Sequence, residues 1–461
     1  MSKPTTTQHK QQVIFQTNQL GPGNDQKIYV REQKGFYQKI RRIFSIVLMG
    51  LFIAIPFIQY QGQQAIIFDL SVQTLKVFDF IFYPHDLLLF VFVFIIAAFL
   101  LFVVSTKYGR IWCGFACPQT IWTLLYIWVE HRVEGPRSKR IALDKSKLTA
   151  NKFIRKTLKH SIWLVISVAT SLVFMSYFVP VTELYIDFFS GKSSALIVSW
   201  VLFFALCTYI NAGWIREKMC EHMCPYSRFQ SVMFNPSTSV VMYDANRGEN
   251  RGPRKLNTDK PTHLGDCVDC NLCVQVCPVG IDIRNGLQYQ CISCGLCIDA
   301  CDQVMSKFGY KSRLIKFGHE ISHNKSKLST LAYSAVIAAM LLSFTVWLFD
   351  RESVEVSVFK DRNILYRTLY SGETENSFTV KLLNKSNKDV VFNIATNLGA
   401  GFIIEGQTNI AVKAQEHKEI TVTIKSPQDY QLSYKQFNFY LSEQSNEQHT
   451  ITHASTFHSQ S

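Results

Sequence analysis

Thirteen cysteines are the residues of this sequence best suited to chemistry, and all of them lie between positions 113 and 301. Eight of them form two runs with the same spacing, Cys-x2-Cys-x2-Cys-x3-Cys, at 267–277 and 291–301. Two intervening residues allow three thiolates to wrap one face of a small iron–sulfur cube, and the fourth ligand then comes from elsewhere in the chain. The spacing therefore predicts two 4Fe–4S clusters, which move electrons one at a time.

The fourth cysteine of each run is expected to bind the cluster of the other run, as in two-cluster proteins with this spacing. This crossed scheme predicts one cluster held by Cys267, Cys270, Cys273 and Cys301, and another held by Cys291, Cys294, Cys297 and Cys277. Zinc sites usually take two Cys-x2-Cys pairs, and disulfides need an oxidising compartment, so both alternatives fit the pattern poorly.

Four further cysteines occur in a repeated Cys-x3-Cys-Pro motif, with Cys113 and Cys117 in the first copy and Cys220 and Cys224 in the second. Each copy follows two apolar stretches and a basic residue. A spacing of four predicts that both sulfurs share one face of a helical turn. The proline after each motif suits either the start of a new helix or the end of the turn that holds the thiols.

Three chemistries suit these four thiols. They bind a soft metal ion such as Cu(I), cycle between dithiol and disulfide, or hold a further iron–sulfur cluster. In the second motif Met219, His222 and Met223 are interleaved with the cysteines, which favours copper, and His222 and Met223 become additional candidate metal ligands. Taken singly, these side chains fit ordinary packing better, and Cys207 reads as a small buried hydrophobic residue.

Composition and charge indicate a membrane protein. Hydrophobic residues make up 48% of the 461 positions, and five apolar stretches lie at about 43–60, 87–104, 161–179, 195–213 and 330–349. Each is close to the ~20 residues that cross a bilayer. The net charge of +14 comes from basic residues beside these stretches, so membrane orientation explains it and no nucleic-acid partner is expected.

The basic loops alternate strongly. Residues 1–42 carry eight Lys and Arg and residues 107–160 carry twelve, whereas 61–86 and 180–194 carry one each. The positive-inside rule then predicts a cytoplasmic N-terminus, cytoplasmic clusters and a periplasmic C-terminus. The apolar segment at 111–129 would break this alternation if it crossed the membrane, so it is predicted to be an interfacial or re-entrant helix.

The last part of the chain has a different pattern. Segments such as 419–424 alternate apolar and polar residues with period two, which predicts an immunoglobulin-like sandwich without a disulfide. The predicted fold class is a multi-domain membrane protein with an α-helical membrane domain, a ferredoxin-like α+β dicluster domain and an all-β immunoglobulin-like C-terminal domain. The predicted boundaries are an N-terminal tail at 1–41, a four-span membrane domain at 42–229, the dicluster domain at 230–328, a fifth transmembrane helix at 329–350 and the β-domain at 351–461.

This layout resembles the FixG/RdxA/CcoG family of cytochrome oxidase accessory proteins. The resemblance covers most of the chain: five spans, two Cys-x3-Cys-Pro pairs, the two cluster runs and the last domain. Membrane ferredoxins of nitrate- and nitrous-oxide-reductase systems share the pairs but are not expected to carry that last domain. The resemblance implies a role in maturing a C-family haem–copper oxidase, and a cupric reductase activity, Cu(II) to Cu(I), ahead of copper insertion.

With this resemblance, the sequence predicts a multi-pass protein of the bacterial inner membrane. Electrons from an unidentified cytoplasmic donor pass through the clusters to copper at the catalytic thiols Cys113, Cys117, Cys220 and Cys224. The implied partners are a copper ion, a copper transporter or chaperone, oxidase subunits and, in a homodimer, a second copy of the chain. Two alternatives stay open: an electron conduit between a quinol pool and a partner reductase, and a non-enzymatic assembly factor. The sequence has no Gly-x-Gly-x-x-Gly motif that would indicate a flavin or nicotinamide site.

Overall fold

The structure, a computed structural model, falls into two compact units, the first ending at Phe344 and the second beginning at Thr345. Part of the predicted N-terminal tail, up to position 26, lies outside the described residues. The described residues are 27–70, 73–78, 80–234, 237–256, 261–319, 325–349, 354–361, 364–385, 388–399, 401–414, 416–428, 434–444 and 446–459.

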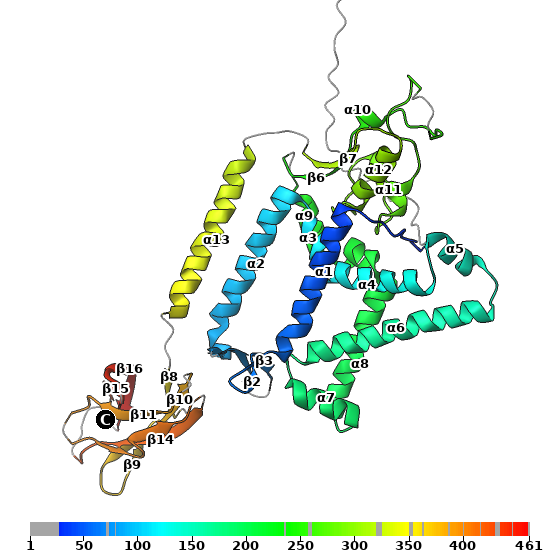
Figure 1. The fold of residues 1–461 in the computed structure, drawn as a ribbon. Coiled ribbons are helices and arrows are strands. Elements are labelled where there is room, and N and C mark those ends of the chain that lie inside the picture. The colour runs from blue at the N-terminus through cyan, green and yellow to red at the C-terminus, as the bar shows by residue number, and fades with distance from the viewer. Residues whose placement is uncertain are drawn as a thin grey trace, which may run out of the picture. The chain divides into compact units, whose positions relative to one another are not determined.

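The five predicted apolar stretches are helices with the length and composition needed to cross a membrane. They are α1 (Phe36–Ala54), α2 (Leu87–Tyr108), α6 (Ala150–Met175), α8 (Ala195–Ile210) and α13 (Lys325–Phe349), labelled in Figure 1. Helix α6 begins earlier than predicted, because the Thr149 side chain caps it by accepting a hydrogen bond from the Lys152 backbone N–H at 3.3 Å.

The apolar segment predicted to lie at the interface is divided into two helices, α3 (Ile111–Phe115) and α4 (Pro118–Val133). Neither is a candidate span among the residues described. The remaining elements of this part are α5 (Arg137–Lys145), α7 (Val181–Ser190), a hairpin of β1 (Gln59–Tyr60) and β2 (Gln63–Gln64), and a sheet of β3 (Ile66–Asp69), β4 (Thr74–Val77) and β5 (Phe80–Phe82).

The dicluster region is small and has little regular structure. Its two strands pair antiparallel, and each cysteine run leads into a helix, α11 or α12. The predicted boundary between 229 and 230 falls inside α9. The elements are α9 (Pro225–Val232), β6 (Val240–Tyr243), α10 (Ala245–Gly248), α11 (Leu272–Gln275), α12 (Leu296–Lys307) and β7 (Ile315–Gly318).

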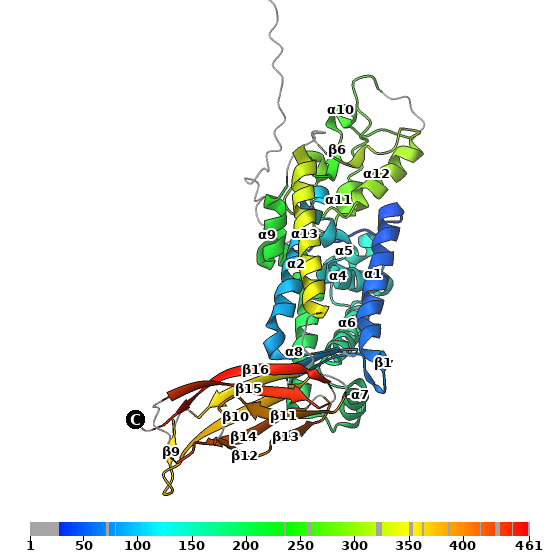
Figure 2. The ribbon, with the colours of Figure 1, turned by 90° about the vertical axis from the view of Figure 1, so that its left-hand side faces the viewer.

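The start of α1 is hydrogen-bonded directly to the dicluster region (Figure 2). The buried carboxylate of Asp299, on α12, accepts hydrogen bonds from the backbone N–H groups of Tyr37 and Gln38 at 3.2 and 2.9 Å. It thus satisfies free donors of the first helical turn and places a negative charge at the positive end of the helix. Gly35 precedes α1 because any Cβ there would collide with Asp299, at 2.2 Å.

The second unit is the predicted sandwich of two antiparallel sheets. One has the order β12-β14-β10-β8, with β9 paired to β10, and the other has the order β13-β11-β15-β16. The strands are β8 (Val354–Lys360), β9 (Arg367–Thr368), β10 (Thr374–Asn384), β11 (Val390–Thr396), β12 (Ile403–Glu405), β13 (Asn409–Val412), β14 (His417–Lys425), β15 (Tyr434–Glu443) and β16 (Asn446–His458).

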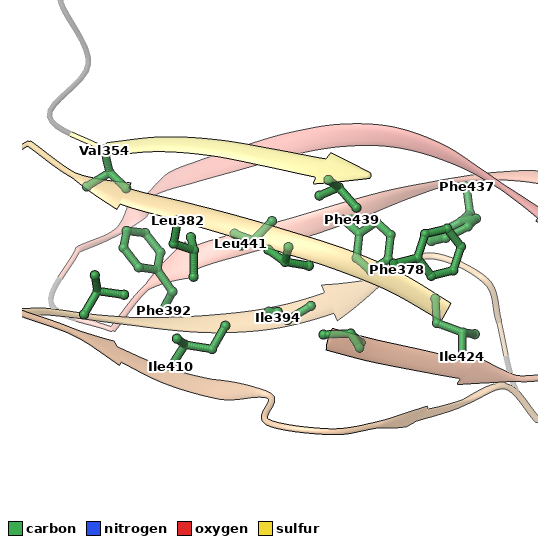
Figure 3. Close-up of a cluster of buried hydrophobic side chains, with 14 of the residues drawn as sticks. Val354, Phe378, Leu382, Phe392, Ile394, Ile410, Ile424, Phe437, Phe439 and Leu441 are labelled. Carbon is green, nitrogen blue, oxygen red and sulfur yellow. The ribbon is translucent and has the colours of Figure 1, made fainter. Parts of the chain in front are cut away.

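Aromatic and branched side chains from both sheets fill the space between them (Figure 3). Alternate residues of β10, including Phe378 and Leu382, are fully buried, as the period-two pattern requires. Phe439 of β15 packs edge to face on Phe378, with ring centroids 5.2 Å apart. All thirteen cysteines lie outside this unit, so apolar packing rather than a disulfide holds its sheets together.

Candidate iron–sulfur and thiol site

Cysteines of the two runs lie close enough to influence one another's pKa across the runs. Negative charge on Cys267, Cys270 and Cys273 acts on Cys301 of the other run and contributes to raising its pKa to about 12, after burial as the main cause. In the same way, Cys277 of the first run is affected by Cys291 and Cys294. The assignment of each thiol as a ligand stays a prediction.

The chain wraps each thiol group by means of left-handed residues at matching positions. Asp269 and Asn271 flank Cys270 with φ of 50° and 54°, and Ser293 and Gly295 flank Cys294 with φ of 51° and 74°. Left-handed backbone is unfavourable for most L-residues, so its repetition at the same offsets indicates a shape that the site requires. Alternating hand also turns successive N–H groups toward one concave surface, which suits an anionic group.

Two buried arginines beside the second run lack acceptors for part of their guanidinium groups. Arg110 is 1% exposed, and its Nη1 donates to the carbonyl oxygen of Tyr289 at 2.5 Å. Its Nε and Nη2 atoms have no hydrogen-bond partner among the described residues, nor has Nε of Arg41. Buried cations need a negative partner. A cube ligated by thiolates would supply that charge, so the residues present fit a 4Fe–4S cluster here.

In both Cys-x3-Cys-Pro motifs the first cysteine lies in a short helix and the second precedes a new one. Cys113 lies in α3, whereas Cys117 is extended and Pro118 is the first residue of α4. Cys220 lies in a π-helical turn at Met219–Met223, and Cys224 is again extended, with Pro225 starting α9. Each helical turn therefore ends at its second cysteine, whose backbone N–H still bonds the turn, at 2.9 Å for Cys117 and 2.8 Å for Cys224. The proline takes the first of its two predicted roles, the start of a new helix.

A hydroxyl group supports each motif at the same offset, which the sequence interpretation missed. Thr120 donates to the carbonyl oxygen of Cys113 at 2.6 Å, and Ser227 donates to that of Cys220 at 2.5 Å. Ser227 also bonds the carbonyl oxygen of Cys224 at 3.0 Å. These hydroxyls stabilise the end of each motif turn, because they donate hydrogen bonds to carbonyl oxygens where the helical pattern is interrupted. Their common position, seven residues after the first cysteine, is visible in the sequence.

The four motif thiols form one electrostatic group. Burial, followed by negative charge on Cys117 and Cys113, raises the pKa of Cys220 to about 12. Burial also raises the pKa of Cys113, an effect that the nearby Arg110 opposes. The Cys113 thiol donates to Oε1 of Gln230 at 3.0 Å. Both thiols are therefore protonated until a metal displaces the proton.

The two additional metal ligands predicted in the second motif lie at the surface. The side chain of His222 is 61% exposed and lies 3.8 Å from Glu221, and Met223 is 63% exposed. Cys207 lies in α8 and is partly buried. Among the residues that the structure describes, no three His, Cys, Asp or Glu side chains converge closely enough for a single metal ion. The eight cysteines of the two cluster runs likewise form no such single-ion site among the described residues.

Both motifs contact the segment that carries the second cysteine run. A Cβ on Gly114 would lie 2.6 Å from the carbonyl oxygen of Ile292 and 3.0 Å from Cα of Cys294, so α3 packs backbone to backbone against the run. From the second motif, Glu221 accepts hydrogen bonds from Tyr289 and Gln290 at 3.2 and 3.3 Å. The second run is therefore the one beside the motif thiols.

A buried ion network fixes the arginine that precedes the second motif. Glu130, on α4, has 0% side-chain exposure and lies 2.7 Å from Arg216 and 2.8 Å from Arg140. Burial alone would raise the pKa of Glu130, but Arg216 and Arg140 hold it at about 2. Removing one member of such a buried pair typically costs about 3–5 kcal/mol. The network therefore locks α4 to the segment leading into Cys220.

Comparison with known proteins places this chain among relatives of matching length. Protein RdxA of Cereibacter sphaeroides is 33% identical over 408 residues, which cover 84% of this chain and 86% of the relative. Protein RdxB of the same organism is 32% identical over 416 residues, or 86% of each chain. The nitrogen fixation protein FixG of Rhizobium meliloti is 32% identical over 406 residues, 78% of this chain and 76% of the relative.

This chain belongs to the FixG/RdxA family. Residues 215–320 match the model of a 4Fe-4S dicluster domain, residues 89–134 that of a 4Fe-4S binding domain, and residues 344–460 that of the IG-like fold at the C-terminus of FixG. A crystal structure of a FixG-related protein from Vibrio parahaemolyticus, 26% identical, covers 24% of this chain and 100% of that one, with a TM-score of 0.22.

As a FixG/RdxA family member, the chain is a membrane-associated electron-transfer protein with two 4Fe–4S clusters. The predicted fold class is confirmed, with five candidate membrane helices, a dicluster domain and an immunoglobulin-like C-terminal domain.

The crossed ligation predicts a specific loss of iron. Replacing Cys277 with Ser should remove the cluster of the second run, leaving about four iron per chain in place of about eight. Cys207→Ser, a matched change of a thiol outside all motifs, should retain about eight. Anaerobic iron and sulfide analysis with EPR of the remaining cluster measures this. Crossed ligation is wrong if Cys277→Ser disturbs only the cluster built on Cys267, Cys270 and Cys273.

The close backbone contact of α3 predicts that one added methyl group at Gly114 destabilises the protein. Gly114→Ala should displace the 292–294 loop, because the new Cβ has no space, and should destabilise the protein by about 1–3 kcal/mol. Gly50→Ala is the control, since a Cβ at Gly50 meets nothing within 4 Å and alanine is the better helix former. Thermal unfolding and iron retention of both full-length variants measure the difference. Equal stability of the two would contradict the close approach.

Proposed function

We propose that this protein reduces Cu(II) to Cu(I) at the motif thiols, for assembly of a C-family haem–copper cytochrome oxidase. The observation that carries the proposal is that both Cys-x3-Cys-Pro motifs contact the segment of the second cluster run. Gly114 meets Ile292 and Cys294 within the run, and Glu221 bonds Gln290, the residue just before it. Electrons held at that run therefore lie beside four thiols that suit a soft metal ion. The family resemblance supports copper as that ion.

The roles of the residues follow from their positions. The clusters, when bound, supply single electrons. Cys113, Cys117, Cys220 and Cys224 bind copper and favour the Cu(I) product, because thiolate is a soft ligand. Arg110 stabilises negative charge between the first motif and the second run. The exposed His222 and Met223 receive copper from solvent rather than enclose it.

A different use of the same thiols has one observation in its favour. The family model that matches residues 89–134 describes a 4Fe-4S binding domain, and this range includes Cys113 and Cys117. Like the cluster runs, the four thiols lie near one another without converging on a single-ion site among the described residues. The four motif cysteines would then hold a further cluster, and the protein would pass electrons onward without a copper substrate.

The proposed topology places the clusters and the thiols on the cytoplasmic face of the inner membrane. It rests on the basic loops at 1–42 and 107–160 and on five candidate spans. Copper reduced there would pass to a copper transporter or chaperone and then to oxidase subunits. The unassigned electron donor and a homodimeric arrangement belong to the same proposal.

Replacing all four motif cysteines with Ser tests the function. The dithionite-reduced variant should lose most of its Cu(II) reduction, at least about tenfold, since the soft ligands are gone. Its iron content should stay at about eight per chain, because the eight cluster ligands remain. Cys207→Ser should behave as the unmodified protein in both assays.

Two results would contradict the copper proposal. Full cupric reduction by the four-Ser variant would show that the thiols are not the site. Loss of iron in proportion to activity would instead assign the motifs to a further cluster.

Reporter fusions test the topology. Fusions after residues 150 and 300 should report the cytoplasm, and one after residue 400 the periplasm, because basic loops are retained inside. An alkaline phosphatase and a green fluorescent protein fusion at each point give opposite signals and control for expression. A cytoplasmic signal after residue 400 would show that the number of crossings differs from five.

A further inference from the structure

A cavity of about 370 Å³ lies between α1, α4, the second thiol motif and the second cluster run. Its walls are mostly apolar and include Met49, Leu124 and Ile292. It reaches Cys220 of the thiol motif and Pro278, the residue after Cys277. The volume falls in the range of pockets that enclose small organic molecules.

The wall formed by α1 carries a polar stripe in the first turns of a candidate membrane span. Gln38, Arg41 and Ser45 lie three and four residues apart on one face of the helix, and all three are buried and line the cavity. Gln38 is 6% exposed and Arg41 is 4% exposed. Oε1 of Gln38 and Nε of Arg41 have no hydrogen-bond partner among the described residues. Polar groups in such a position usually serve a ligand or a function.

The same stripe lies close to thiols of the second cluster group. Arg41 lies close enough to Cys294 and Cys277 for negative charge on these thiols, which belong to one predicted ligand group, to act on its guanidinium group. A molecule bonded to Gln38 and Arg41 therefore lies beside the cluster that also faces the thiol motifs. A ligand in this position would be close enough to exchange electrons with that cluster.

We propose that this cavity binds a membrane quinol, which is the electron donor. A quinol has an apolar ring and tail that suit the walls. Its hydroxyl donates to the free Oε1 of Gln38, and its oxidised carbonyl accepts from Nε of Arg41. Charged residues such as Arg31, Glu32 and Glu217 also line the cavity, and the apolar share of its surface is what favours a donor with an apolar ring and tail. A phospholipid would fill the apolar part but offers no electrons.

The reaction balances without another reactant. Oxidation of one quinol to quinone breaks two O–H bonds and releases two electrons and two protons. The electrons reduce the two clusters by one each, and the protons leave to water. This inference rests on the proposed function only for the next step, in which the two electrons convert two Cu(II) to two Cu(I).

The test uses the full-length protein in lipid nanodiscs, with decylubiquinol as the probe. Decylubiquinol should reduce the clusters anaerobically, measured by loss of cluster absorbance and gain of the reduced EPR signal. Gln38→Leu should slow this reduction and weaken azidoquinone photolabelling by about tenfold, as expected for loss of one hydrogen bond to a buried group. Gln59→Leu, the same change at an exposed position on β1, should alter neither.

Dithionite separates this inference from the proposed function. Dithionite should reduce the clusters of Gln38→Leu fully, and the variant so reduced should still convert Cu(II) at the normal rate. The quinol site is wrong if decylubiquinol fails to reduce the unmodified protein, if Gln38→Leu is reduced as fast as Gln59→Leu, or if only phospholipid occupies the cavity and quinone fails to displace it. Failure of copper reduction with dithionite would count against the proposed function alone.

Discussion

The packing of the dicluster region against the membrane helices depends on the burial of positive charge beside thiol groups. Arg110 and Arg41 are nearly inaccessible to solvent, and parts of both guanidinium groups lack acceptors among the described residues. Such cations are tolerated only where negative charge is held nearby. The thiols of the second run supply it when they are deprotonated on a cluster, so cluster insertion and docking of the dicluster region onto the membrane helices stabilise each other.

The two halves of the membrane domain share a sequence pattern but differ in the partners of the arginine that precedes each motif. Each has an arginine before its motif and a hydroxyl seven residues after its first cysteine. Arg216 is neutralised by the buried Glu130, whereas Arg110 donates to the backbone carbonyl of Tyr289 and lies beside the Cys113 thiol. Burial and neighbouring thiols raise the pKa of the first cysteine in both motifs, and Arg110 opposes this increase at Cys113 and at Cys220.

Local pattern in the sequence predicted much of this protein, because the spacing of cysteines, the length of apolar stretches and period-two alternation each report on a few neighbouring residues. The sequence left two roles open for the proline after each motif, and the structure selects one of them, since Pro118 and Pro225 start new helices. The contact of Gly114 with Ile292 and the capping of α1 by Asp299 join segments far apart in the chain. A single sequence read by local pattern does not show such pairs.

The position of the second run also explains why two clusters are useful. The segment of that run contacts both motifs, through Gly114 and Glu221, and the cavity, through Ile292. The first run includes the exposed Cys270. In the proposed mechanism a donor releases two electrons and each copper ion accepts one. A single one-electron carrier could not take both, so a second cluster, which Cys267, Cys270, Cys273 and Cys301 would hold, would supply a place for the second electron.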